Sequence, residues 1–262
     1  MTAKIVIVSG GTTGMGRATA LARAERGDQV TVLGRSRRGL PSSVRFLPAD
    51  LSSIAEVERV AAEITNRHDR VDALALFANR PMPRRTETAD GLEYTFALYY
   101  LSRYLLAARL APLLDSQSVI INVAGVGNTA GAVNWADPQL RDRYGVVRAQ
   151  LQAGRANDLL GAGYDGKARY VLYHPGFTRS GLDSHPNPVV RGVLKTLALF
   201  AARPVEKSIV PILNWIDHPP TEPLTAIDRG KPVDLLLKTL DPNDARRLRT
   251  YTESLLNGTG PR

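Results

Sequence analysis

The stretch "KIVIVSGGTTGMGRATALARA", residues 4–24, joins a short apolar run to a glycine-rich turn and then to a helical pattern. Such a turn at the carboxyl end of a first strand lets the backbone approach a pyrophosphate, whose charge then lies on the free N–H groups of the following helix. A glycine motif alone also fits a simple loop. The strand before the turn and the helix after it favour a dinucleotide site.

The same two kinds of segment alternate along the rest of the chain. Amphipathic stretches, notably 54–67, 91–114 and 139–160, separate the short apolar runs "QVTVLGR", "VRFLPAD", "DALALFAN", "SVIINVAG" and "ARYVLYHPG". This alternation predicts an α/β fold, a single-domain doubly wound parallel sheet with helices on both faces. At the end of the chain we expect a last helix, with Asp241 as its N-cap and Gly258 as its stop.

The composition narrows the class of protein. The chain of 262 residues has no cysteine, so neither a disulfide framework nor a thiolate metal site can form, and a cytoplasmic location is expected. The longest apolar stretch, residues 96–114, contains Arg103 and Arg109, which are costly in a bilayer, so we expect a buried helix and no membrane partner. The net charge is +9, but the arginines are scattered, so we expect a solvated basic surface and no nucleic-acid partner.

The glycine spacing, Gly10-x-x-x-Gly14-x-Gly16, resembles that of the short-chain dehydrogenase/reductase family. Other landmarks agree in order over about residues 4–180: Gly-Arg at 34–35, Asp-Leu at 50–51, "LFAN" at 76–79, the apolar helix of residues 88–114 and "HPGFT" at 174–178. The resemblance implies a Rossmann-like fold that holds a nicotinamide cofactor.

The resemblance also implies roles for matching positions along the cofactor. The expected contacts are Gly10 and Gly16 in the turn, Thr12, Thr13, Gly14 and Met15 around the phosphates, Asp50 and Leu51 at the adenine, Ala78 and Asn79 at the ribose, and Pro175, Gly176 and Thr178 at the nicotinamide. Asn79 stands where the family prefers glycine, so the ribose contact is altered there.

The end of the second strand indicates which cofactor is bound. Members that use NAD place an acid there to accept from the ribose hydroxyls, whereas this chain reads "LGRSRR". A guanidinium can pair bidentately with the 2′-phosphate of NADP, which an acid would repel. We therefore expect NADP, with Arg35 and Arg38 as its contacts.

The family's four catalytic positions are changed in this chain. The resemblance implies acid-base assisted hydride transfer by a tyrosine, a lysine four residues on, a serine after the fifth strand and an asparagine on the preceding helix. The fifth strand here ends in Ala124 and Gly125, and Tyr99 stands at the asparagine position. Thr129, Tyr99 and Tyr100 carry hydroxyls nearby, but turn and packing roles are the more common ones for such residues.

Two registers are open for the tyrosine and lysine within "RYGVVRAQLQAGRANDLL", residues 143–160. In the first, Tyr144 and Arg148 keep an acid beside a permanent cation, and the downstream distance to "HPG" fits. The second rests on the similarity of "RANDLL" to the family's stretch beyond its lysine, and fits the upstream distance from the fifth strand. It puts Leu151 or Gln150 at the tyrosine and Arg155 or Gly154 at the lysine. We favour Tyr144 and Arg148 as the catalytic pair.

We thus expect an NADP(H)-dependent oxidoreductase that reduces a carbonyl or activated double bond of a small hydrophobic metabolite, with a non-standard proton donor. Residues 180–225 match the family's substrate lid, and "KTLALFAA" gives it an apolar face. His174 is expected to be a packed strand-end residue. The alternatives are a non-redox catalyst on the same scaffold and a catalytically silent NADP sensor. Pairing through helices at 91–114 and 139–160 would give a homodimer or homotetramer.

Overall fold

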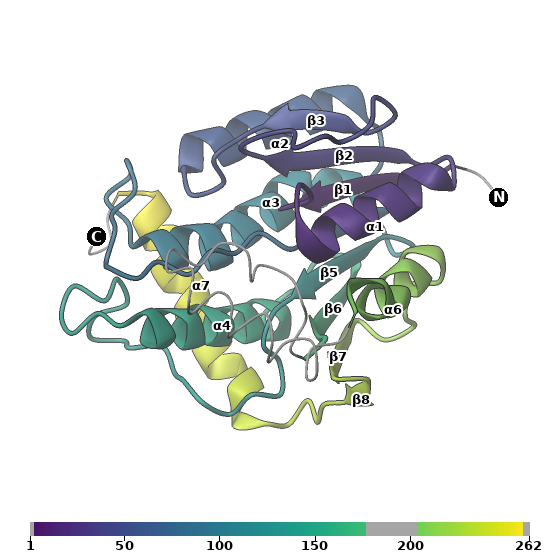
Figure 1. Cartoon of the computed structure of the whole chain (residues 1–262). Coiled ribbons are helices and arrows are strands. Elements are labelled where there is room, and N and C mark those ends of the chain that lie inside the picture. Colours follow the sequence, from purple (N-terminus) through teal and green to yellow (C-terminus); the bar gives the residue numbers. More distant parts are fainter. Residues whose placement is uncertain (1–2, 177–203, 259–262) are drawn as a thin grey trace.

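The computed structural model describes residues 3–176 and 204–258, whose strands form one twisted sheet (Figure 1). The strands are β1 (Ile5–Ser9), β2 (Gln29–Gly34), β3 (Arg45–Pro48), β4 (Ala73–Leu76), β5 (Val119–Val123), β6 (Arg169–His174), β7 (Leu224–Asp228) and β8 (Lys231–Pro232). Their order in the sheet is β3-β2-β1-β4-β5-β6-β7-β8, parallel throughout except that β8 runs antiparallel to β7. The α/β doubly wound prediction is confirmed.

Helices cover both faces of this sheet. On one face lie α1 (Gly14–Glu25) and α6 (Val205–Asp217). On the other lie α2 (Ile54–Arg67), α3 (Ser102–Leu110), α4 (Val146–Ala162) and α7 (Pro242–Leu256). A short 3-10 turn at Ala111–Leu113 follows α3, and another at Lys238–Leu240 precedes α7.

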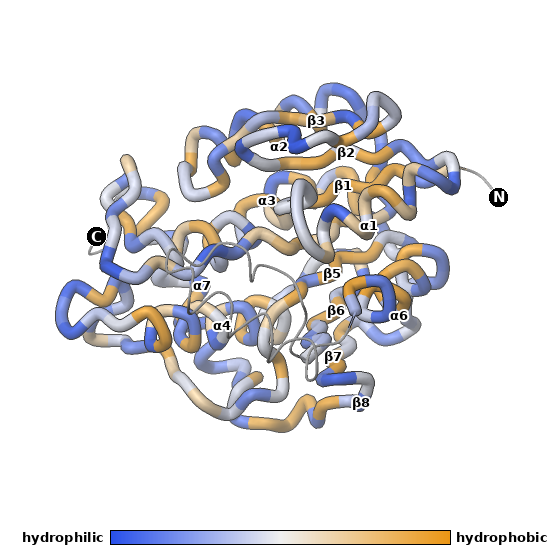
Figure 2. The backbone as a smooth tube through the Cα atoms, in the orientation of Figure 1, coloured by the Kyte–Doolittle hydropathy of each residue, from blue (hydrophilic) through white to orange (hydrophobic). Residues whose placement is uncertain are grey.

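The central strands are buried on both faces, and successive side chains of a strand pack on opposite faces of the sheet. In β5, Ile120 packs under α3 and α4, whereas Val119 and Ile121 pack under α1 and α6. The central strands β2 and β5 are accordingly mostly apolar, and both appear orange in Figure 2. Two apolar layers, one on each face, therefore hold the sheet.

The apolar segment around residue 100 is a buried helix, as predicted. It starts as a π-helix at Phe96–Leu101 and continues as α3, and Arg103 within it is fully buried. π-helical turns often occur at functional sites. None of the helices in the described residues is long and apolar enough to span a bilayer.

The last helix, α7, lies across α3 and α4 on the far side from the sheet (Figure 1). Asp241 caps it by accepting hydrogen bonds from the backbone N–H groups of Asn243 and Asp244, and Gly258 follows its end with a φ of +72°. Both expected ends of this helix are confirmed. Its buried Leu248 and Leu255 belong to the apolar layer shared with α3 and α4.

Candidate active site

The glycine-rich turn between β1 and α1 has the geometry of an anion-binding loop. Gly10 and Gly14 have φ angles of +68° and +54°, in the left-handed region that side chains disfavour. A Cβ on Gly10 would lie 2.7 Å from the Ala78 backbone nitrogen, and one on Gly16 would lie 2.5 Å from the Gly10 carbonyl oxygen. The turn therefore packs directly against the end of β4, with no room for side chains.

The first turn of α1 leaves its N–H groups available to a ligand. Thr13 is the N-cap, but its side chain makes no capping hydrogen bond, and the first turn carries no acidic residue. The positive end of the helix dipole then faces the space above the turn. These features fit a dinucleotide pyrophosphate, held by the expected residues from Gly10 to Gly16.

Three arginines follow β2, and they have different environments. Arg37 donates hydrogen bonds to the carbonyl oxygens of Leu40, Pro41 and Val44, so it fixes its own loop. Arg38 donates from Nε to Ser36 Oγ at 3.3 Å. Arg35 is exposed, and it makes no hydrogen bond or ion pair with the part of the chain that the structure describes. Arg35 is the guanidinium of this loop that is most free to take a phosphate.

Other predicted cofactor residues lie along the carboxyl edge of the sheet. Asp50 Oδ1 accepts from the backbone N–H and the hydroxyl of Ser52, at 3.0 Å and 2.7 Å, so this carboxylate closes the turn after β3. Leu51 and Ala78 are buried. Gly176 has a φ of +85° after β6. Thr178 and residues 180–203 of the expected lid lie outside the described residues.

A buried cation lies beneath the ends of β4 and β5. Arg103 donates to Asn122 Oδ1, to the carbonyl oxygen of Val123 at 2.9 Å and to that of Ala78 at 3.1 Å. Its guanidinium also lies over the Tyr99 ring, 4.7 Å from the centroid. Burial lowers the pKa of Arg103 to about 10, so this group keeps its charge at neutral pH. Arg103 thus fixes the two strand ends at which the ribose is expected.

The face of α4 that meets these strand ends is defined by three contacts. Gln150 exchanges hydrogen bonds with Asn79 after β4, Ala153 packs against Ala124 after β5, and Asn157 accepts from the side-chain amide of Asn122 in β5. Residues three and four apart share one face of a helix. Gly154 lies four residues after Gln150 on this face, and a Cβ there would meet nothing within 4 Å.

Tyr144 and Arg148, the favoured catalytic pair, lie elsewhere. Tyr144 precedes α4, which begins at Val146, and its hydroxyl donates to the Met82 carbonyl oxygen at 2.8 Å. Arg148 is exposed and donates to the Arg143 carbonyl oxygen. Because Tyr144 lies outside α4, the two residues do not share a helix face, which was the reason for pairing them. Their catalytic role stays a prediction, as does the second register, whose Gln150 and Gly154 lie on the face of α4 that meets the strand ends.

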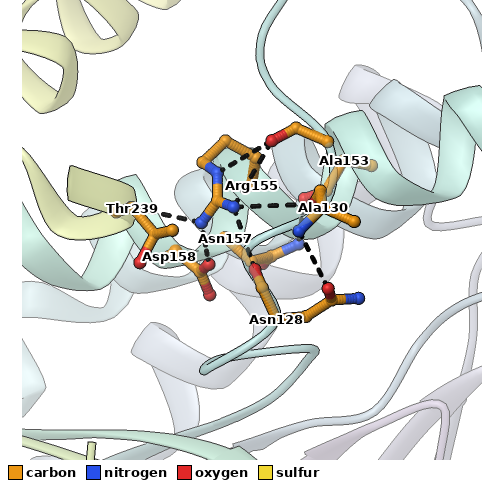
Figure 3. A network of polar contacts seen from close by, with 8 residues as sticks. Asn128, Ala130, Ala153, Arg155, Asn157, Asp158 and Thr239 are labelled. Carbon is orange, nitrogen blue, oxygen red and sulfur yellow. Dashed lines mark hydrogen bonds and ion pairs between the residues drawn. The ribbon is translucent and has the colours of Figure 1, made fainter. Parts of the chain in front are cut away.

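Leu151 and Arg155 are the other option in the second register, and both contact the loop after β5. Figure 3 shows Arg155 directed towards this loop. A Cβ on Gly131 would lie 2.7 Å from the Leu151 Cβ. Arg155 donates to the Asn128 carbonyl oxygen at 2.9 Å and forms an ion pair with Asp158 at 2.6 Å. Both charged side chains are buried, at 8% and 2% exposure. This pair holds the loop of residues 128–131 against α4.

Ala124, one of the two residues that stand where the family usually has serines, is surrounded by small and aromatic groups. Ala124 forms a buried cluster with Tyr99 and Ala153. Burial raises the pKa of the Tyr99 hydroxyl, and Arg103 offsets part of that effect. Tyr99 therefore keeps its proton at neutral pH and fills space next to Ala124.

The site includes a pair of residues that the sequence did not single out as functional. His174 Nδ1 at the end of β6 lies 2.8 Å from Asp228 Oδ1 at the end of β7. Arg229 contacts the same carboxylate, with Nη2 2.8 Å from Asp228 Oδ2. A histidine directly after a strand and before Pro-Gly was a visible signal, but its carboxylate partner is 54 residues away.

The comparisons with known proteins establish the family. The model of the short chain dehydrogenase family matches residues 4–137, and the chain belongs to this family. Retinol dehydrogenase 13 of Mus musculus is 30% identical over 70% of this chain and 60% of its own length. A Streptomyces sp. (strain C5) protein described as a daunorubicin C-13 ketoreductase is 28% identical over 78% of this chain and 80% of its own length.

Solved structures agree on the fold. A crystal structure of a protein from Mycobacterium paratuberculosis matches with a TM-score of 0.69 and 22% identity, covering 99% of this chain and 95% of that one. A short-chain dehydrogenase from Streptomyces avermitilis matches with a TM-score of 0.61 and 21% identity, covering 98% and 95%. At this identity the matches establish the fold alone. The family as a whole uses a nicotinamide cofactor, NAD or NADP.

Proposed function

We propose that this protein is an NADP(H)-dependent oxidoreductase that reduces a carbonyl or an activated double bond of a hydrophobic metabolite. The observation that carries the choice of cofactor is Arg35, an exposed guanidinium without a partner among the described residues, at the end of β2. An acid at this place would repel a 2′-phosphate, whereas an arginine pairs with it. The names of the relatives, a retinol dehydrogenase and a ketoreductase, support a substrate with an alcohol or ketone.

The residues of this chain would hold the cofactor along the carboxyl edge of the sheet. The turn from Gly10 to Gly16 and the first turn of α1 would bind the pyrophosphate, and Arg35 with Arg38 would bind the 2′-phosphate. Ala78 and Asn79 would lie along the ribose. When bound, NADPH supplies a hydride, and the protein supplies orientation and proton transfer.

Calorimetric titration with NADP+ and NAD+ tests the cofactor. We expect tighter binding of NADP+, and the variant Arg35→Asp should weaken it about ten- to a hundredfold, because hydrogen bonds between charged groups contribute about 1.5–3 kcal/mol. The control is Arg67→Asp, an exposed arginine at the last residue of α2, away from the site. Tighter binding of NAD+ by the unaltered chain would overturn the proposal.

A second candidate is a non-redox catalyst on the same scaffold. Ala124, Gln150 and Gly154 favour it, because none of the three can supply the proton chemistry of a serine, a tyrosine and a lysine at those places. The two functions separate in one assay with ketones and enones, in which NADPH absorbance is followed beside substrate loss. Substrate conversion at constant absorbance would favour the second candidate.

A further inference from the structure

The strand order places His174 beside Ala124, one of the two residues that stand where the family usually has serines. The Ala124 N–H donates to the Tyr173 carbonyl oxygen at 3.0 Å, so Ala124 continues the β5 ladder next to the end of β6. His174 follows Tyr170 and Leu172 in the alternation of β6, and both of these pack on the α4 side of the sheet. Ala124 contacts Ala153 of α4 on that same side. The His174 imidazole and the Ala124 side chain therefore lie on the same side of the sheet, at its carboxyl edge.

The contacts of His174 orient its ring. Nδ1 lies 2.8 Å from Asp228 Oδ1, and the register pairs these two residues across β6 and β7. Nε2, on the other side of the ring, has no hydrogen-bond partner among the residues that the structure describes, and the side chain is 32% exposed. One nitrogen is thus held by a carboxylate, and the other makes no hydrogen bond to the described part of the chain.

The carboxylate is kept ionised by its neighbours. Burial acts to raise the pKa of Asp228, but hydrogen bonds from Arg229 and His174 outweigh it and leave this pKa below its ordinary value. An ionised Asp228 favours the tautomer with the proton on Nδ1, which leaves Nε2 for exchange with another group.

We infer that His174, oriented by Asp228, is the catalytic proton-transfer residue of this protein, in place of the family's tyrosine. The inference rests on the proposed oxidoreductase function. In reduction, the hydride from NADPH forms the new C–H bond at the carbonyl carbon, and the proton on His174 Nε2 goes to the carbonyl oxygen. The products are an alcohol and NADP+, and neutral His174 regains its proton from water. In the reverse direction, neutral Nε2 takes the hydroxyl proton.

Tyr99 is the competing donor, because it too contacts Ala124. Its ring is 8% exposed and stacks on Arg103, which is the contact of a packing residue. Its pKa is raised by burial, so its phenolate would be costly to form. His174 combines exposure with an ionised partner, and the observations favour it.

The pH dependence depends on the charges around His174. Asp228 at the end of β7 contacts His174, and Arg229 contacts Asp228. Lys231 of β8 pairs with Asp228 in the sheet and adds a second positive charge nearby. On α4, the charged residues near the inner face of the helix are Arg155 and Asp158, and they form an ion pair with each other. Because reduction takes up a proton and oxidation releases one, reduction should slow as pH rises and oxidation should accelerate.

Nuclear magnetic resonance tests the placement without turnover. The chain has four histidines, so the His174 imidazole signal is identified by its loss in His174→Gln. Saturating NADP+ should move this signal and leave His218 unmoved, because His218 follows α6 at the opposite edge of the sheet. If NADP+ binds by calorimetry but the His174 signal stays in place, the inference is overturned. If no NADP+ binds, the proposed function itself fails.

Kinetics with NADPH and a panel of ketones and enones test the role. His174→Gln should lower kcat at least about a hundredfold with NADP+ affinity unchanged, as expected for loss of a general acid. Asp228→Asn should lower kcat and shift the pH profile, whereas the matched control His218→Gln should do neither. A hundredfold loss in Tyr99→Phe or Tyr144→Phe, with His174→Gln fully active, would assign the proton to that tyrosine instead.

Discussion

The side-chain amides of Asn79 and Gln150 exchange two hydrogen bonds, with Asn79 Nδ2 2.9 Å from Gln150 Oε1 and Gln150 Nε2 3.2 Å from Asn79 Oδ1. This contact joins the loop after β4 to α4. Asn79 is the residue expected at the ribose, and Gln150 is one of the two residues that the second register puts at the family's tyrosine. We therefore expect the second register, with Gly154, one turn later on the same face, at the position of the lysine.

This register predicts a gain of function. The triple variant Ala124→Ser, Gln150→Tyr, Gly154→Lys should reduce ketones faster than the unaltered chain, because it restores three groups at positions that share one side of the site. Space for the lysine exists, since a Cβ on Gly154 meets nothing within 4 Å. NADPH oxidation measures the gain. The matched control, Ala124→Ser with Leu151→Tyr and Arg155→Lys, should gain nothing, and a gain there alone would contradict the register.

The buried pair of Arg155 and Asp158 predicts a large effect on stability. Arg155→Leu removes the donor to the Asn128 carbonyl oxygen and leaves Asp158 buried without a cation. Loss of one partner of such a pair costs about 3–5 kcal/mol. Urea unfolding at a pH of about 8, above the pKa of Asp158 in the unaltered chain, should show this loss. Arg148→Leu, an exposed arginine on the same helix, should change the free energy of unfolding by less than about 0.5 kcal/mol.

Asp158 also predicts how stability varies with pH. Burial raises its pKa to about 7, although Arg155 acts in the opposite direction. An unfolded aspartate titrates near about 4, so between these values the folded chain holds a proton that the unfolded chain has released. The contribution of Asp158 to stability is then largest below about pH 4 and is lost as pH rises towards 7.

The variant Asp158→Asn isolates that contribution. Between about pH 5 and 7.5 the unaltered chain should lose stability relative to the variant, because asparagine does not titrate and all other groups cancel in the difference. Chemical denaturation at several pH values measures it. A difference that stays constant across this range would show that Asp158 titrates alike in both states.

Local signals explain why the fold was predictable from the sequence. The apolar run before Gly10, the turn itself and the helix after it are contiguous, and each strand from β2 to β6 lies in a short apolar run of its own. Asp241 and Gly258 are likewise local signals for the ends of α7. Helix and strand propensities and the hydrophobic pattern depend on residues close together in the sequence. They therefore predict elements that the folded chain also contains.

The details of the site depend on contacts between distant segments. Counting residues could not settle the start of α4, because the preceding loop turns at Leu140 and Arg143 with φ angles of +46° and +51°. Such residues in the left-handed region carry no clear sequence signal. The contact of His174 with Asp228 needs β7 beside β6, which only the assembled sheet provides. The packing of α7 against α3 and α4 likewise joins segments that are far apart in the sequence.

The place of α7 bears on the expected homodimer or homotetramer. Pairing through α3 and α4 would need a free apolar face, but Leu248 and Leu255 of α7 pack there, and the Tyr100 and Thr252 hydroxyls are 2.8 Å apart. We therefore expect any assembly to use another face. The oligomeric state itself stays a prediction.

A disulfide that ties α7 to α4 tests this expectation in a chain that has no cysteine of its own. A Cβ on Gly163 would lie 3.2 Å from the Ala245 Cβ, close to the 3.5–4.5 Å or so that disulfides span, so Gly163→Cys with Ala245→Cys should oxidise readily. Light scattering should give the oxidised variant, its reduced form and the unaltered chain the same molar mass. A mass that falls on oxidation and recovers on reduction would mean that α7 swings out and the chain pairs through α3 and α4.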